Sequence, residues 1–142
     1  KNKNQPESMR YLPFIPAPRY QSRIRIKIKP VNKHLSDFYL LAEADHYFRQ
    51  NQYLKENHTE TATPQYTLVN TGIGGNLIDQ HKNVLFSVYF SANNLFNIAY
   101  QNHLSRLKYA PINPATGRMG IFNMGRNFSI KVVITIDFYT RK

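Results

Sequence analysis

The chain has 142 residues, no cysteine and a formal net charge of +11 at pH 7. The lack of cysteine excludes a disulfide scaffold, a thiolate zinc site and a cysteine nucleophile. Aromatic residues make up 13% of the chain, too many for a disordered segment. No apolar run reaches about 18 residues, so we expect no transmembrane helix. A transmembrane strand needs only about 10 residues with every second one apolar, and a polar composition leaves that class open.

The first part of the chain predicts a β-hairpin. Residues 19–29 contain the run Arg-Ile-Arg-Ile-Lys-Ile-Lys, a strict two-residue alternation that is typical of a strand with one apolar face. A turn over 30–36 begins at Pro30, and the alternation resumes over 37–50. The first 18 residues are expected to form a loop segment ahead of the hairpin.

Charged residues occupy one face of this predicted hairpin. If Lys29 lies opposite Asp37, then Arg23 falls opposite Glu43, and Ile residues fall opposite apolar residues on the other face. We call the charged set the charge ladder, and it comprises Arg23, Arg25, Lys27, Lys29, Glu43 and Asp45. The favoured interpretation is mutual neutralisation of these charges across the two strands. Two alternatives stay open: a site for an anionic ligand, and a basic sheet that binds nucleic acid.

Three further long strands are predicted in the rest of the chain. They cover 65–78, 84–100 and 121–138. A tight turn at 79–83 separates two of them, whereas the loops over 51–64 and 101–120 are long. Gly72, Gly74 and Gly75 predict a bend or bulge in the first of the three. The expected fold class is therefore all-β, a long antiparallel meander of about five strands, with strands about twice the usual length of about 5–6 residues.

Four segments resemble the C-terminal part of the barrel of TonB-dependent outer-membrane receptors, of the kind found in Bacteroidetes. Residues 93–100 are similar to the family's Asn-Leu-Phe-Asp-x-x-Tyr signature near the end of the penultimate strand. The matching residues are Asn94, Leu95, Phe96 and Tyr100, and Asn97 stands where Asp is usual. The other likenesses are Leu-Pro-x-x-Pro at 12–16, Tyr-Thr-Leu-Val-Asn at 66–70 and the last strand over 120–138.

The resemblance implies a membrane transport function and no enzymatic activity. Family members are 22-stranded barrels with an N-terminal plug, located in the outer membrane of Gram-negative bacteria. They take up scarce nutrients such as siderophores, haem, cobalamin or glycans. The implied partners are the remainder of the barrel and the plug domain, outer-membrane lipid, TonB and the barrel assembly machinery. This chain supplies only about five strands, so the family function requires further residues.

Orientation and site residues follow from the same resemblance. The short turns would face the periplasm, and the long loops and residues 1–18 would lie outside, with the charge ladder in the lumen and the apolar face toward lipid. Phe138 would be the aromatic insertion signal, followed here by a tail over 139–142. The candidate extracellular ligand contacts are His103, Arg106, Lys108, Tyr109 and Arg118.

No residue pattern predicts catalysis, a bound metal or a cofactor. The five histidines have no partner at ligand spacing, and the glycines of the third strand lack the Lys-Ser or Lys-Thr of a phosphate loop. Nucleic acid is not an expected partner. Two alternatives to the receptor remain: a soluble basic β-sheet domain that binds nucleic acid, and a structural outer-membrane barrel without TonB coupling.

Overall fold

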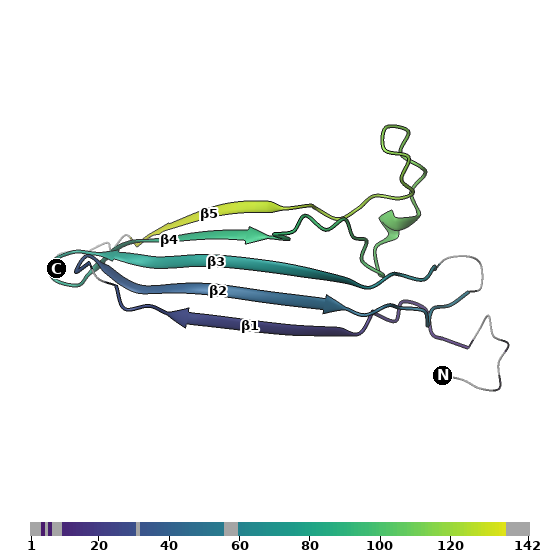
Figure 1. Ribbon diagram of the computed structural model, residues 1–142, viewed down its shortest axis with the longest axis horizontal. Coiled ribbons are helices and arrows are strands. Elements are labelled where there is room, and N and C mark those ends of the chain that lie inside the picture. Colours follow the sequence, from purple (N-terminus) through teal and green to yellow (C-terminus); the bar gives the residue numbers. More distant parts are fainter. Residues whose placement is uncertain (1–3, 5, 7–9, 31, 56–59, 136–142) are drawn as a thin grey trace, which may run out of the picture. The chain divides into compact units, whose positions relative to one another are not determined.

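The computed structural model describes residues 4, 6, 10–30, 32–55 and 60–135, and it is all-β. Five strands form one sheet in the order of the sequence, which confirms the predicted meander (Figure 1). The strands are β1 (Arg19–Lys27), β2 (Leu35–Tyr47), β3 (Tyr66–Ile78), β4 (Val84–Asn93) and β5 (Asn127–Ile134). A single turn of 3-10 helix, η3 (Arg106–Tyr109), lies between β4 and β5 in the sequence. Within the described ranges no helix has the length and apolarity to cross a membrane.

The chain divides into two compact units, which we describe separately. The loop unit comprises Lys1–Gln21, Asp45–Leu68 and Asn97–Gly125. The sheet unit comprises Ser22–Ala44, Val69–Phe96 and Arg126–Lys142.

Two strands differ from their predicted bounds around the loop over 101–120. The fourth strand ends at Asn93 and not at residue 100, and the fifth begins at Asn127 and not at residue 121. Asn94 and Asn97 have φ of 50° and 54°, in the left-handed region where a strand cannot continue. Asn adopts this region more readily than most residues. Apolar alternation does not indicate such a change in φ, so the predicted fourth strand is too long.

The register of the sheet unit agrees with the predicted hairpin. The backbone N–H of Ile28 donates to the carbonyl of Phe38 at 2.9 Å, and this pair belongs to the register that places Arg23 opposite Glu43. Further along the sheet, Tyr89 of β4 pairs with Gly74 of β3. On its other side the same tyrosine pairs with Lys131 of β5.

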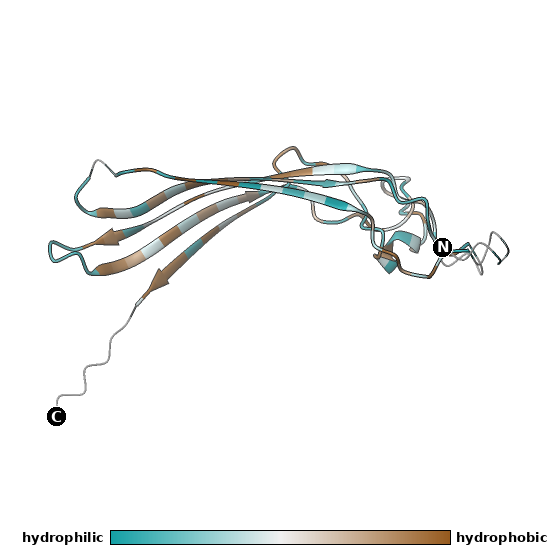
Figure 2. Ribbon diagram, turned by 90° about the horizontal axis from the view of Figure 1, so that it is seen from below, coloured by the Kyte–Doolittle hydropathy of each residue, from teal (hydrophilic) through white to brown (hydrophobic). Residues whose placement is uncertain are grey.

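The sheet unit has one polar and one apolar face, because successive side chains of a strand point to opposite sides. The polar face carries Arg23, Arg25, Lys27, Tyr39, Glu43, Asn70, Asn76, Ser87, Tyr89, Ser91, Ser129, Lys131 and Val133. The apolar face carries Ile24, Ile26, Phe38, Leu40, Val69, Ile73, Leu77, Phe86, Val88, Phe90, Ala92, Phe128, Ile130, Val132 and Ile134. Brown and teal bands accordingly alternate along the strands in Figure 2.

The apolar face is not covered by any other part of the described chain. Ile24 is 60% exposed, Phe128 59% and Ile130 72%. Among the described residues, Ala92 is the only hydrophobic side chain that is buried. A soluble domain of this size normally encloses many such side chains, so this sheet has no core of its own.

The glycines of β3 serve close packing and do not interrupt the strand. β3 runs continuously from Tyr66 to Ile78, and the register of its pairing with β4 shifts between Leu77 and Ile78, not at the glycines where a bend or bulge was predicted. A Cβ on Gly74 would lie 2.6 Å from Cδ1 of Tyr89 and 2.9 Å from Cε1 of Tyr39. The two tyrosine rings therefore lean over β3 from the strands on either side, and only glycine leaves room for them.

Candidate functional site

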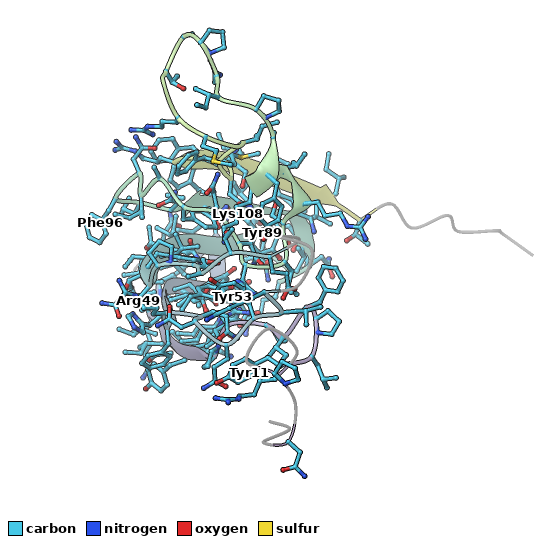
Figure 3. All side chains as sticks on the ribbon, turned by 90° about the vertical axis from the view of Figure 1, so that its right-hand side faces the viewer. Tyr11, Arg49, Tyr53, Tyr89, Phe96 and Lys108 are labelled. Carbon is cyan, nitrogen blue, oxygen red and sulfur yellow. The ribbon has the colours of Figure 1, made fainter. Side chains whose placement is uncertain are left out.

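A buried lysine holds two long loops of the loop unit together. Lys108 of η3 is only 8% exposed (labelled in Figure 3). Its Nζ donates to the carbonyls of Thr61 and Ala62 at 3.0 and 2.9 Å. A third bond of 2.7 Å goes to Oγ1 of Thr63. The three oxygens satisfy all three ammonium donors, so the buried charge is fully hydrogen bonded.

His103 extends this cluster. Its Nδ1 lies 2.7 Å from Oγ1 of Thr63, and the histidine is 5% exposed. Thr63 Oγ1 accepts a hydrogen bond from Lys108, and the tautomer of His103 sets which of Oγ1 and Nδ1 is the donor in the second bond. Nε2 of His103 is buried and has no hydrogen-bond partner among the described residues. Burial, followed by the charge of Lys108, lowers the pKa of His103, and Glu60 opposes this shift. The imidazole is therefore neutral at pH 7.

Two more buried polar side chains fix the segment before β1 against the loop after β2. Glu60 is 5% exposed, and its two carboxylate oxygens accept from the backbone N–H groups of Phe14 at 2.6 Å and Leu54 at 2.8 Å. Gln50 is 4% exposed, and its Nε2 donates to the carbonyl of Ile15 at 3.2 Å. In these irregular loops, side chains thus form the hydrogen bonds with backbone N–H and carbonyl groups that neighbouring strands form in a sheet.

An aromatic stack crosses the loop unit. The ring centroids of Tyr47 and Tyr66 are 4.6 Å apart with planes inclined by 21°, and those of Tyr66 and Tyr100 are 4.7 Å apart. The guanidinium of Arg19 lies 5.2 Å from the centroid of Tyr47 and continues the row. Such offset contacts rigidify the unit beyond the area they bury.

A cavity of about 470 Å³ adjoins this stack within the loop unit. Its lining combines aromatic residues with neutral hydroxyl and amide groups, notably Tyr66, Tyr100, Phe122, Gln65, Gln101 and Thr67. Lys108 also lines it, with its ammonium already occupied by three oxygens. The volume is that of a small-molecule pocket.

The five predicted ligand contacts fall into two groups. His103 and Lys108 are buried and engaged in the loop cluster, so their placement is that of structural residues. The hydroxyl of Tyr109 accepts from the backbone N–H of Thr61 at 3.1 Å. Arg106 and Arg118 are exposed, and their guanidinium groups lie near aromatic rings, at 6.0 and 5.4 Å from the centroids. The two arginines are thus the most accessible of the five.

A polar network crosses four consecutive segments of the sheet unit. Nε of Arg23 donates to Oε2 of Glu43 at 2.6 Å, as the predicted register requires. The other carboxylate oxygen accepts from Nδ2 of Asn70 at 3.1 Å. Oδ1 of Asn70 in turn accepts from the backbone N–H of Asn94 at 2.9 Å. Asn94, the first matching residue of the receptor-like motif, is therefore connected to Glu43 of the charge ladder by hydrogen bonds through Asn70. The alternation pattern predicts no role for Asn70.

The rest of the charge ladder is only partly neutralised. In the loop unit, Asp45 pairs with Arg19 at 2.6 Å. In the sheet unit, Arg25 stacks on Tyr39 with its Cζ 3.8 Å from the ring centroid. Lys27 has no carboxylate within ion-pair distance in the described part of the chain, and Lys29 lies beyond the end of β1. The predicted neutralisation is confirmed for Arg23 with Glu43 and does not extend along the whole ladder.

The other motif residues lie outside β4. The backbone N–H of Leu95 donates to the carbonyl of Val69 at 2.8 Å. Phe96 is 66% exposed and projects outward in Figure 3. Tyr100 belongs to the aromatic stack. The motif thus marks the point where the chain leaves the sheet. Phe138 and residues 139–142 lie outside the described residues.

We expect Gly120→Ala to weaken the loop unit much more than Gly117→Ala. Both glycines have positive φ, 75° and 65°, so both substitutions carry a backbone strain of about 1–2 kcal/mol. A Cβ on Gly120 would also lie 2.3 Å from the carbonyl oxygen of Lys108, whereas nothing lies within 4 Å at Gly117. The clash adds about 1–3 kcal/mol. Thermal unfolding of the two variants measures the difference, and equal melting temperatures would refute the close packing at Gly120.

The loop unit should loosen as the pH falls from 7.5 to 5. The pKa of His103 is lowered from its ordinary 6.5 in the folded state, so the unfolded chain binds the proton more readily. The contribution of His103 to stability is complete above that ordinary value and declines as the pH drops below it. Hydrogen exchange over 101–120 reports the loosening. His103→Asn should abolish the pH dependence, while His81→Asn, at an exposed turn residue, should retain it; a dependence that survives His103→Asn would contradict the assignment.

No group of three or more potential metal ligands from His, Cys, Asp or Glu occurs within the described ranges. Comparisons of the chain with family models, curated proteins and solved structures give no match.

Proposed function

We propose that this chain is part of the barrel wall of a TonB-dependent outer-membrane receptor, which takes up a scarce nutrient with energy relayed by TonB. The observation that carries the proposal is the uncovered apolar face of the sheet unit, where Ile130 is 72% exposed and Phe128 59%. Lipid is the solvent in which such a face is stable without a protein cover. The polar face, with its ion pair and amide network, suits a water-filled or protein-filled lumen.

Strand length and sheet edges support the same proposal. β2 and β3 have 13 residues each and β4 has 10, against the 9–11 that a tilted strand needs to cross a bilayer. β1 and β5 are the two edges of the sheet. Pairing with further strands of a closed barrel satisfies their free N–H and carbonyl groups.

The soluble-domain alternative is less compatible with these observations. It requires the Ile/Phe face to be a closed core, and within the described residues only Ala92 is a buried hydrophobic side chain. The resemblance of residues 93–100 to the receptor signature favours energised transport over a purely structural barrel.

Two measurements on the full-length protein test the proposal. A membrane barrel should need detergent to stay dispersed, and its unheated form should migrate differently from its heated form in gel electrophoresis. Identical migration together with a monodisperse protein in detergent-free buffer would rule out the membrane assignment. Binding of the purified periplasmic domain of TonB then separates a receptor from a structural barrel, since only a receptor should bind it.

A further inference from the structure

Two hairpin connections of the sheet unit lie at the same end of the sheet (Figure 1). Residues of both connections line an open hollow. The backbone N–H of Ile78, at the end of β3, donates to the carbonyl of His34 at 2.9 Å and joins the two connections. The hollow has a volume of about 480 Å³ and is lined by Lys33, His34, Asp79, Gln80 and Lys82.

The lining of the hollow is cationic. Lys33 and Lys82 are exposed, and neither has a carboxylate within ion-pair distance among the residues that the structure describes. The one acid, Asp79, is committed to its own turn. Its Oδ1 accepts from the backbone N–H groups of His81 and Asn83, both at 2.8 Å, and Nδ2 of Asn83 donates to its Oδ2 at 3.0 Å. The lining therefore holds two lysines without an ion-pair partner among the described residues and a single carboxylate whose acceptor sites are largely filled.

Asp79 keeps its negative charge near neutral pH, so the excess of positive charge in the lining is the same throughout that range. The side-chain hydrogen bond from Asn83, followed by backbone hydrogen bonds, lowers the pKa of Asp79, so the carboxylate is charged at any pH near neutrality. Counting one charge each for Lys33, Lys82 and Asp79, these three side chains of the lining carry a net charge of +1. An anion is the ligand that completes this set of charges.

Two exposed apolar residues follow the second turn directly in the sequence. β4 starts at Val84, the residue after the turn over 79–83, and Val84 and Leu85 are 42% and 51% exposed. A free inorganic anion gains nothing from this apolar surface. A ligand with an anionic headgroup and an apolar tail uses both features.

We propose that the hollow between the two short turns binds the headgroup phosphate of an anionic phospholipid, with the acyl chains against the apolar face of the sheet unit. The site rests on the proposed membrane function, because lipid reaches the hollow only if the strands cross a bilayer and the turns lie at its surface. Lys33 and Lys82 then act as a pair of cations at that surface, where each basic residue strengthens attraction to acidic lipid.

Native mass spectrometry of the full-length protein, released from micelles containing equal amounts of phosphatidylglycerol and phosphatidylethanolamine, tests the site. We expect preferential retention of phosphatidylglycerol. Lys33→Gln and Lys82→Gln should each reduce that preference about fivefold, and the double variant about 25-fold. Lys131→Gln removes another exposed lysine, from the polar face of β5, and should leave the preference unchanged.

Three results would overturn the proposal. The first is equal retention of the two lipids. The second is an equal loss of preference in the Lys131→Gln control. The third is displacement of phosphatidylglycerol by millimolar inorganic phosphate, which would make the hollow a site for free anions. Heat-modifiable migration of the same samples distinguishes failure of the lipid site from failure of the proposed membrane function. If the protein shows heat-modifiable migration but no lipid preference, only the lipid site is refuted. If the parent protein shows no heat-modifiable migration, the membrane function is refuted as well.

Discussion

Val132→Arg should destabilise the full-length protein by about 2 kcal/mol or more, whereas Val133→Arg should cost less than about 1 kcal/mol. The two valines are neighbours on β5 and differ in the face they occupy. Val132 lies on the apolar face and is 55% exposed, and Val133 lies on the polar face opposite Ser87 and is 38% exposed. In the proposed barrel the first substitution places a charge in hydrocarbon, and the second places it in the lumen.

Both variants replace valine by arginine in the same strand. The changes in β-strand propensity and in net charge are therefore the same in both and do not contribute to the difference between them. Reversible unfolding in urea with refolding into lipid vesicles measures the two free energies. If the apolar face were exposed to water, both substitutions would be surface changes within about 0.5 kcal/mol of the parent. Equal and small effects would therefore contradict the lipid-facing assignment.

The strands and their faces could be predicted because alternation is a local signal. Arg23 and Glu43 meet as predicted, since the period of two and a short turn together restrict the register. The end of β4 could not be predicted in this way. Apolar alternation does not register the left-handed φ of Asn94, which turns the chain out of the sheet. The close packing of two tyrosine rings over Gly74 could not be predicted either, because Tyr39 and Tyr89 belong to the strands on either side of β3.

The sequence predicts only part of the cluster formed by Lys108, His103 and Thr63. The polar and basic residues over 101–120 predict His103 and Lys108 as ligand contacts. Their burial depends on Thr63, which is 40 residues from His103 and 45 from Lys108 in the sequence. Contacts at that separation in irregular segments leave no periodic signal. Glu60 and Gln50 were missed for the same reason, although a buried acid in a loop rich in backbone donors is a common solution to unpaired N–H groups.

Lys108→Met should open the loop unit and leave the sheet unit intact. The substitution keeps much of the aliphatic volume but removes three hydrogen-bond donors, leaving the carbonyls of Thr61 and Ala62 without their ammonium partner. Of the three acceptors only Thr63 Oγ1 is buried, and a buried acceptor left unpaired costs about 1–3 kcal/mol, so we expect a loss of about 1–3 kcal/mol in the local stability of the two loops.

Hydrogen exchange resolves this local effect, because amides of both loops should exchange faster in the variant while those of β3 and β4 keep their protection. Arg106→Met is the matched control, since Arg106 lies in the same 3-10 turn and is exposed. It should change loop exchange by no more than about 0.5 kcal/mol. Unchanged exchange in Lys108→Met would mean that the ammonium does not hold the loops. Faster exchange in both variants would assign the effect to the turn itself, whereas faster exchange in Lys108→Met alone identifies the buried cation as the group that joins the two loops.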